Sequence, residues 1–167
     1  QKKLNLKIKK REGFRPFAPS VLEEDYFDYF EGKTLSPYML LVKKIQSNIK
    51  LKIPKFYWEL EYWNKLYTKR SKLQSITHVD FSARIQSVSR KTNTRYWHLI
   101  NEFKKLTGVS VLVNTSFNVR GEPIVNTPED AFKCFMNTDM DYLVINNFLY
   151  EKVGQVADIE KQHFIKD

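Results

Sequence analysis

The stretch SVLVNTSFNVRGEPIVNTPED, residues 110–130, decides how the rest of the sequence is interpreted. The apolar run 109–113 predicts a buried strand, and the apolar pair 124–125 indicates a second strand. Between them lie amides, hydroxyls and a single cation, Arg120. Because a plain hairpin needs only about two turn residues, this number of hydrogen-bonding side chains raises the hypothesis of a binding loop, although the pattern alone favours an ordinary turn.

The polar side chains of this loop have the chemistry of an anion site. Asn114, Ser116 and Asn118 alternate, so in an extended chain they point the same way. Arg120 can bind two oxygens of one phosphate or carboxylate with its planar guanidinium, and Gly121 permits a turn that a side chain would block. The competing interpretation is an ordinary turn, because Asn and Ser are common in turns.

Two helices are predicted near this loop. In NTPEDAFKCFM, Thr127 stands at the N-cap, Pro128 at the first helical position, and Asp130 where it forms a near capping box. Over 92–106 the apolar residues recur at helical spacing, and Gly108 is placed to cap the end of that helix.

The rest of the chain alternates predicted strands with short helices. We expect strands in FRPFAPSVL (14–22), SPYMLLVKKI (36–45) and MDYLVINNFLY (140–150), two joined strand-like alternations in SITHVDFSARIQSVS (75–89), and a short helix in LEEDYFDYFEG (22–32). The aromatic-rich span 46–74 is predicted to be an excursion, helical around 57–66, whose aromatic residues pack locally or form a docking surface. Interleaved strands and helices indicate one α/β domain with a mixed sheet.

Composition indicates a globular protein. The 167 residues are 42% hydrophobic and 14% aromatic, which is too apolar for a disordered chain. No apolar run approaches the roughly 18 residues of a membrane helix, and the first residue is Gln rather than Met, so we expect a fragment. The single Cys134 excludes an internal disulfide and fits a reducing, cytoplasmic compartment. Its place on a predicted helix favours a buried structural thiol over a nucleophile.

The net charge of +9 is typical of a protein with an anionic partner, and a solvated basic surface is the alternative for any single lysine. Nucleic acid is one candidate, because phosphate backbones attract Lys and Arg. The cations stand in separate blocks rather than along one helix face, however, which favours a small anion such as a nucleotide or an acyl phosphate. One group surrounds the entry to the first predicted strand and contains Lys9, Lys10, Arg11 and Arg15.

A further cation, Arg84, stands inside a predicted strand among small and apolar neighbours. An arginine in such a place usually has a carboxylate or phosphate partner, because an unpaired buried charge is costly. An internal ion pair with Asp80 is the alternative to a ligand.

The motifs together are more specific than any one of them. REGFRPFAPSVL, SPYMLLV, THVDFSARIQSVSR and NTRYWHLINEFKKLTGVSVLVNTSFNVRGEPIVNTPEDAFKCFMNTDMDYLVINNFL, in this order, closely resemble the C-terminal domain of the NodU/CmcH O-carbamoyltransferase family. The resemblance implies a YrdC-like fold, which is an α/β domain with a twisted mixed sheet and flanking helices. It implies a single domain at 1–152 with an excursion at 46–74, followed by a peripheral tail at 153–167.

The resemblance also implies a reaction. Such a domain consumes carbamoyl phosphate and ATP, which brings its own Mg²⁺, and gives carbamoyl-adenylate, pyrophosphate and phosphate. A separate N-terminal domain would transfer the carbamoyl group to a hydroxyl and would carry the metal-binding histidines of the family. We expect no protein-bound metal in this chain, because His78, His98 and His163 lack paired spacing, and we expect His78 to pack or position its neighbours.

Site roles follow from the resemblance residue by residue. Arg11, Arg84 and Ser116 are expected to act in catalysis, where cations and donors stabilise charge that builds on phosphate oxygens. The expected substrate- and nucleotide-binding residues are Lys9, Lys10, Arg15, Asn114, Asn118 and Arg120. A double-stranded-RNA-binding module and a non-catalytic scaffold domain are the alternatives. Nucleic acid is not the favoured partner, and no membrane partner is expected.

Overall fold

The structure, a computed structural model, describes residues 1–155. The chain divides into two compact units. One unit joins Gln1–Arg15 to the chain from Ser116 onward, and the other is Pro16–Thr115. Most of the tail predicted for 153–167 lies outside the described residues, as does His163.

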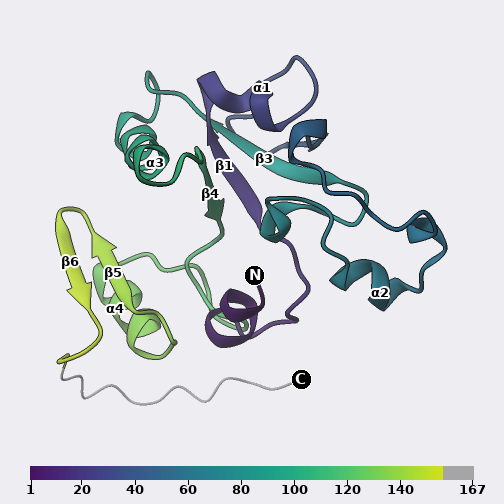
Figure 1. The fold of residues 1–167 in the computed structure, drawn as a ribbon. Coiled ribbons are helices and arrows are strands. Elements are labelled where there is room, and N and C mark those ends of the chain that lie inside the picture. Colours follow the sequence, from purple (N-terminus) through teal and green to yellow (C-terminus); the bar gives the residue numbers. More distant parts are fainter. Residues whose placement is uncertain (156–167) are drawn as a thin grey trace. The chain divides into compact units, whose positions relative to one another are not determined.

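The unit Pro16–Thr115 is built on a four-stranded sheet in the order β2-β3-β1-β4. The strands are β1 (Ala18–Leu22), β2 (Leu41–Lys44), β3 (Ser82–Val88) and β4 (Val111–Asn114). Strands β1 and β3 run parallel, whereas β4 pairs antiparallel with β1 and β2 pairs antiparallel with β3. The predicted α/β class with a mixed sheet is therefore confirmed (Figure 1).

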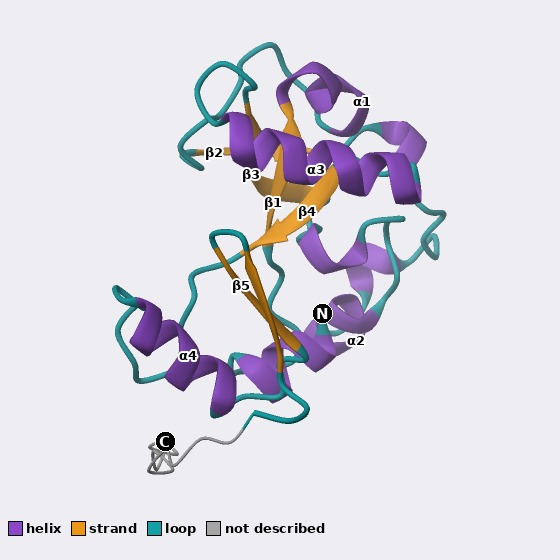
Figure 2. Ribbon diagram, turned by 90° about the vertical axis from the view of Figure 1, so that its left-hand side faces the viewer, coloured by secondary structure: helices purple, strands orange, loops and turns teal. Residues whose placement is uncertain are grey.

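Helix α3 (Thr94–Thr107) covers one face of this sheet, as Figure 2 shows. The Asn93 side chain accepts a hydrogen bond from the backbone of Tyr96 at its start, and Gly108 ends it in the left-handed conformation, with φ 75°. Glycine adopts that conformation without steric cost, so the predicted cap is confirmed. Ile100 packs with Leu22 and Val88 in a buried cluster.

The opposite face of the sheet is the more apolar one. Val21, Ala83 and Ile85 point to this side and are fully buried. Tyr26, at the start of the short helix α1 (Tyr26–Tyr29), is also fully buried. The predicted helix in this region is thus present, although most of its acidic start forms a 3₁₀ turn instead.

The excursion at 46–74 is a loop closed at its base by backbone hydrogen bonds. The Leu51 N–H donates to the Arg70 carbonyl at 2.9 Å, and the Lys72 N–H donates to the Ile49 carbonyl at 2.9 Å. Its helical parts are a 3₁₀ turn, Tyr57–Glu59, and helix α2 (Tyr62–Tyr67). Helix is therefore present in the region where it was predicted.

The first of the two alternations predicted in 75–89 is not a strand. Residues Gln74–Ile76 form a 3₁₀ turn, and only the second alternation becomes β3. Local hydrogen bonds favour the turn, because the Thr77 hydroxyl donates to the Leu73 carbonyl at 2.9 Å and contacts the Ser71 hydroxyl at 2.8 Å. Apolar alternation alone did not reveal this competition.

The other unit contains helix α4 (Pro128–Met136) and a hairpin of β5 (Tyr142–Ile145) and β6 (Phe148–Glu151). Thr127 and Asp130 form a complete capping box around Pro128, as predicted. The single strand predicted at 140–150 is wrong, because the chain reverses at Asn146, which has φ 55°. Asparagine tolerates this left-handed conformation better than most residues.

The second strand predicted at 124–125 is also wrong. After β4 the chain is irregular as far as α4. The Val125 N–H donates to the Phe117 carbonyl at 3.0 Å, but no ladder forms around this bond. The polar residues from 115 onward therefore lie in a loop, not between two strands. The chain also begins with a π-helical turn, Leu4–Ile8.

Candidate functional site

The unit that joins Gln1–Arg15 to the chain from Ser116 contains an open cavity of about 330 Å³. Both segments of the unit contribute to its wall. The lining residues are Lys9, Arg11, Arg15, Ser116, Asn118, Val119 and Arg120. The structure therefore brings six of the nine residues predicted for the site to one cavity, which we call the cationic cavity.

Lys9 joins the two segments. Its side chain is buried, and its Nζ donates to the Asn118 carbonyl at 2.6 Å and to the Ser116 carbonyl at 2.8 Å. The Asn118 Oδ1 at 2.8 Å and the Ser116 Oγ at 3.3 Å are further acceptors. These partners are dipoles rather than carboxylates, so Lys9 holds the loop in shape and leaves its positive charge in the cavity wall.

The side chains of Ser116 and Asn118 are tied to each other as well. The Ser116 Oγ donates to the Asn118 Oδ1 at 2.6 Å, and the Asn118 Nδ2 donates to the Glu122 carbonyl at 2.9 Å. The alternation of these residues places them on one side of the loop, as predicted, but it also lets them bond to each other. In this structure Asn118 stabilises the loop.

Arg11 is oriented by Asn5, which the sequence analysis did not single out. The Arg11 Nε donates to the Asn5 Oδ1 at 2.7 Å, and the Asn5 Nδ2 donates to the Arg15 carbonyl at 2.8 Å. Asn5 is fully buried in the π-helical turn. An asparagine between two leucines gives no chemical signal in the sequence, so only the structure reveals its positioning role.

The remaining cations of the cavity differ in their surroundings. The Arg15 Nε lies 2.7 Å from the Glu12 Oε2 in an exposed ion pair. The Arg120 side chain is exposed, and its backbone N–H donates to the Lys9 carbonyl at 3.3 Å. Lys10 is exposed too and has φ 52°, and it does not line the cavity. Of the two neighbouring lysines, Lys9 lines the cationic cavity and Lys10 does not.

The electrostatics of the cationic cavity favour an anion. Four of its lining residues are cations, and none is a carboxylate. Burial lowers the pKa of Lys9, and the neighbouring Arg11 lowers it further. Burial also lowers the pKa of Arg11, with a further contribution from Arg15. These positive charges lower one another's pKa values because they repel each other. A bound anion offsets that repulsion.

The charges of two of these arginines also act on a nearby carboxyl, that of Glu12. The pKa of Glu12 is lowered first by a hydrogen bond from its own backbone, and the charges of Arg15 and Arg120 lower it as well. Glu12 is the ion-pair partner of Arg15 but does not line the cavity.

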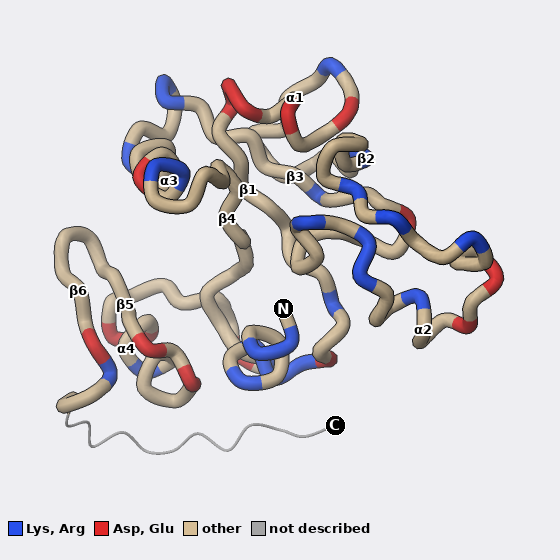
Figure 3. Tube along the Cα trace, in the orientation of Figure 1, with Lys and Arg blue, Asp and Glu red and all other residues tan. Residues whose placement is uncertain are grey.

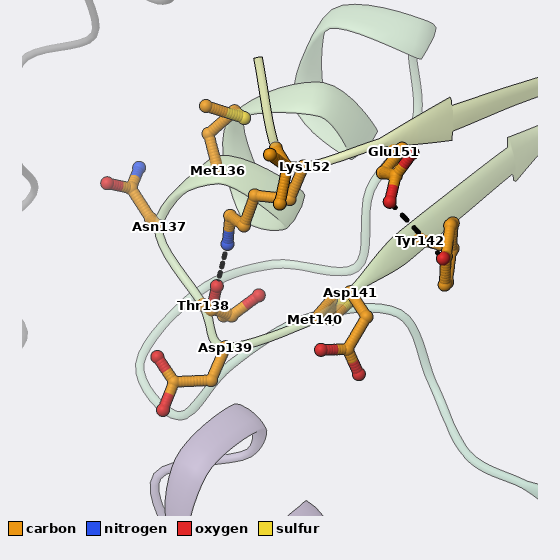
Figure 4. Close-up of a pocket in the computed structure, with 10 residues that line it drawn as sticks. Met136, Asn137, Thr138, Asp139, Met140, Asp141, Tyr142, Glu151 and Lys152 are labelled. Carbon is orange, nitrogen blue, oxygen red and sulfur yellow. Dashed lines mark hydrogen bonds between the residues drawn. The ribbon is translucent and has the colours of Figure 1, made fainter. Parts of the chain in front are cut away.

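A second, larger cavity of about 590 Å³ lies in the same unit, between the end of α4 and the β5–β6 hairpin (Figure 4). Its lining includes Asp139, Asp141 and Glu151. The one lysine there, Lys152, donates to the carbonyls of Phe135 and Thr138 and so caps the end of α4. These carboxylates repel phosphate. The second cavity is therefore a poor candidate for binding an anion, although it is the larger of the two.

Cys134 also lies in this unit, on α4. The thiol is buried, and burial raises its pKa to about 11. The thiol is therefore protonated at neutral pH and is a poor nucleophile. The prediction of a buried thiol is confirmed.

The other predicted site residues, Arg84 and Asn114, belong to the unit Pro16–Thr115. Directly paired residues of neighbouring strands point to the same face of a sheet. The pairs Val42 with Arg84, Ser20 with Gln86, and Ala18 with Asn114 therefore share one face. Arg84 and Asn114 thus lie on the same side of one sheet, two strands apart.

A hydrogen-bond network organises this polar face. The Gln86 Oε1 accepts from the Ser20 Oγ at 2.9 Å and from the Asn114 Nδ2 at 2.6 Å, and the Gln86 Nε2 donates to the Pro37 carbonyl at 3.2 Å. Neither Ser20 nor Gln86 is among the residues predicted for the site. Gln86 stands two residues after Arg84, so the strand alternation could have placed it on the same face.

Arg84 itself is exposed in the middle of β3, so the expectation that a solvated arginine would be out of place there is wrong. The alternative ion pair with Asp80 does not form either. The Asp80 Oδ2 instead lies 2.8 Å from the Lys44 Nζ, and the Asp80 Oδ1 accepts from the Ser82 hydroxyl at 2.6 Å. The His78 Nδ1 contacts the same hydroxyl at 3.0 Å, which fits a positioning residue.

Within residues 1–155, no helix has the length and apolarity to cross a membrane. No group of three or more His, Cys, Asp or Glu side chains in that range has the arrangement of a metal site.

Comparison with known proteins identifies the family. Residues 1–152 match the family model described as the carbamoyltransferase C-terminus. The chain belongs to this family. The resemblance inferred from the motifs is thereby confirmed.

Three relatives illustrate the similarity. The chain is 56% identical over 155 residues to an uncharacterized protein of Synechocystis sp., covering 93% of this chain and 25% of that protein. It is 43% identical over 153 residues to the nodulation protein NolO of Bradyrhizobium diazoefficiens, covering 90% of this chain and 24% of that protein. It is 30% identical over 145 residues to the 3'-hydroxymethylcephem-O-carbamoyltransferase of Amycolatopsis lactamdurans, covering 87% of this chain and 24% of that enzyme. The chain spans about a quarter of the length of these relatives.

Proposed function

We propose that this chain is the part of an O-carbamoyltransferase that binds ATP and carbamoyl phosphate and forms carbamoyl-adenylate. The observation that carries the proposal is the cationic cavity, where four cations and no carboxylate line a space of about 330 Å³. Family membership and a relative named as a carbamoyltransferase supply the chemistry that such a cavity would serve.

The proposed reaction balances in two steps. Water cleaves carbamoyl phosphate to carbamate and phosphate. A carbamate oxygen then forms a bond to the α-phosphorus of ATP while the bond to pyrophosphate breaks, which gives carbamoyl-adenylate. The second step joins two anions, so guanidinium and ammonium groups fixed in advance would stabilise the charge that builds on the phosphate oxygens. The attacking oxygen is already an anion and needs no strong general base. Mg²⁺ would arrive with ATP.

The structure supports distinct roles for the cavity residues. Arg11, held by Asn5, and the exposed Arg120 are suited to bind phosphate oxygens through their planar guanidinium groups. Lys9 would act mainly through its charge and its hold on the loop, because its protons already face four acceptors. Ser116 would donate to a ligand oxygen by turning its hydroxyl away from Asn118.

The polar face of the sheet, in the unit Pro16–Thr115, would bind substrate through groups of its own. Arg84 supplies an exposed cation there. Asn114 and Gln86 supply amides whose directions are fixed by the network with Ser20. We assign this face to substrate binding.

The acceptor and its transfer belong to the rest of the protein in this proposal. The relatives carry about three quarters of their length outside the matched region. A preceding domain would pass the carbamoyl group to a hydroxyl of the acceptor. We propose a cytoplasmic location, where ATP and carbamoyl phosphate are available.

The decisive assay is the exchange of labelled pyrophosphate into ATP. If carbamoyl-adenylate forms reversibly, label enters ATP only when carbamoyl phosphate is present. Replacing Arg11 by Met should slow this exchange about tenfold or more, since a lost charged contact to phosphate is worth at least about 1.4 kcal/mol. The matched control is Arg95→Met, which removes an exposed arginine of α3. Exchange that does not depend on carbamoyl phosphate would refute the proposal.

A thermal-shift screen separates this function from the alternatives, because a ligand that binds the folded state stabilises it. The proposal predicts stabilisation by ATP with Mg²⁺. An RNA-binding module would instead be stabilised by double-stranded RNA, with a steep dependence on salt. A scaffold domain would respond to neither.

A further inference from the structure

The excursion in the unit Pro16–Thr115 presents a group of exposed aromatic side chains. Each of them is more than half exposed to solvent. They are Phe56, Trp58, Tyr62, Trp63 and Tyr67, and we call them the aromatic surface. Exposed aromatic residues gathered in one short segment are typical of an interface rather than of free surface.

A fixed scaffold carries the aromatic surface. Tyr57 is fully buried, and its hydroxyl donates to the Val79 carbonyl at 2.8 Å. Its ring packs against the Trp58 ring in a T-shaped arrangement, with the ring centroids 5.0 Å apart. The Trp58 ring also packs against the Phe81 ring, with the centroids 6.3 Å apart. Trp58 is therefore held in place while its outer face remains open.

Arg70 fixes the other end of the excursion. Its side chain is buried, and its guanidinium donates to the carbonyls of Lys65, Leu66 and Thr77. Two of these carbonyls belong to α2, so Arg70 holds in place the helix that carries Tyr62, Trp63 and Tyr67. Side chains that are held before binding lose less entropy when a partner covers them.

The charges around the aromatic surface indicate the chemistry of its partner. Lys52, Lys55 and Lys69 are exposed and flank the aromatic residues in the sequence, and Figure 3 shows Lys and Arg positions on the chain around α2. Glu59 and Glu61 are exposed among the aromatic residues themselves. Exposed carboxylates within the same short segment repel the phosphates of nucleic acid and of an anionic lipid surface. The pattern fits an apolar protein surface with an acidic rim.

We propose that the aromatic surface is the docking site for the rest of the full-length polypeptide. The relatives are about four times as long as this chain, so a large part of the same molecule is available to cover it. Interfaces between domains of one chain bury about 600–1,500 Å², and aromatic residues are common at the core of such contacts. The inference rests on the proposed function only in assuming that the chain works as part of a longer protein.

Photo-crosslinking in the full-length protein tests this proposal. The photoreactive residue p-benzoylphenylalanine is placed at the position of Tyr62 or of Tyr67, and at Tyr38 as a control. Tyr38 is 80% exposed in the same unit and lies outside the excursion. Docking predicts crosslinks from positions 62 and 67 to residues that precede Gln1 in the same polypeptide, and none from position 38. Crosslinks only between copies, or only to lipid or nucleic acid, would overturn the proposal, as would no crosslink at all.

Hydroxyl-radical footprinting of the unmodified full-length protein provides a second measurement. Trp58 and Trp63 should be oxidised about fivefold or more slowly than free tryptophan, because an interface core excludes solvent. Oxidation at the rate of the free amino acid would show that nothing covers them. Neither measurement reads nucleotide chemistry, so failure of docking and failure of carbamoyl-adenylate formation are distinguishable.

Discussion

Replacing Asn5 by Leu should remove a hydrogen bond that orients Arg11 while keeping the number and branching of the side-chain heavy atoms. The variant loses the bond from the Arg11 Nε to the Asn5 Oδ1 at 2.7 Å and the bond from the Asn5 Nδ2 to the Arg15 carbonyl at 2.8 Å. A hydrogen bond to a charged group contributes about 1.5–3 kcal/mol and a neutral one about 1 kcal/mol. We therefore expect the free energy of unfolding to fall by about 3 kcal/mol, measured by urea denaturation.

The same variant should weaken the binding of ATP about tenfold, because Arg11 keeps its charge but loses its orientation, and tenfold corresponds to about 1.4 kcal/mol. A double-mutant cycle with Arg11→Met isolates this coupling. Once Leu stands at position 5, removal of the Arg11 guanidinium should cost much less affinity than it does in the wild type. Additive losses in the cycle would show that Asn5 does not act through Arg11. Asn64→Leu, at an exposed position of α2, is the control, and its free energy of unfolding should change by no more than about 0.5 kcal/mol.

Three further predictions concern the scaffold. Lys10→Gly should leave the free energy of unfolding in urea unchanged or raise it by up to about 1 kcal/mol. Lys10 has φ 52°, and glycine adopts a positive φ without steric cost. A clear fall in the free energy of unfolding would show that the Lys10 side chain stabilises the loop. Arg70→Met should destabilise the unit by about 3 kcal/mol and expose the excursion to trypsin, since three carbonyls lose a buried charged donor; unchanged proteolysis would contradict the anchoring role. Burial raises the pKa of Asp80, but hydrogen bonds from Lys44 and Ser82 outweigh burial and lower it to about 2. Asp80 therefore stabilises the fold above its unfolded pKa, near 3.8, and this stabilisation is lost as the pH falls toward about 2. Thermal melts should show the wild type more stable than Asp80→Asn by about 1 kcal/mol at pH 6, an amount discounted for the exposure of this ion pair, with the difference vanishing near pH 2.

The parts of the fold that the sequence predicts well are those where local chemistry decides the structure. Thr127, Pro128 and Asp130 define the start of α4 through side-chain and backbone groups within one turn, and Gly108 ends α3. The reversal at Asn146 was missed because the turn lacks the glycine that usually marks a hairpin. Apolar runs such as Ile124 and Val125 predict a strand only if a partner strand is present, and sequence alone cannot supply that partner.

The candidate site, too, was predicted from the sequence only in part. The residue types around Lys9, Arg11 and Arg120 predict an anion site, and the structure brings them to one cavity. Lys9 and Asn118 bond to each other although they lie more than 100 residues apart in the chain, and no local sequence pattern encodes such a contact. The role of Asn5 is hidden for a related reason, because a buried amide acquires its function from the carbonyl and the guanidinium that the fold places beside it.

Isothermal titration of ATP with Mg²⁺ into the 167-residue chain tests the central claim most directly, namely that the cationic cavity binds a phosphate group. The account predicts saturable binding at one site. It also predicts affinity about 100-fold weaker in the Arg11→Met, Arg120→Met double variant, since loss of two charged contacts corresponds to about 2.8 kcal/mol, and unchanged affinity in Arg95→Met. Equal affinity in the wild type and in the folded double variant would contradict the claim.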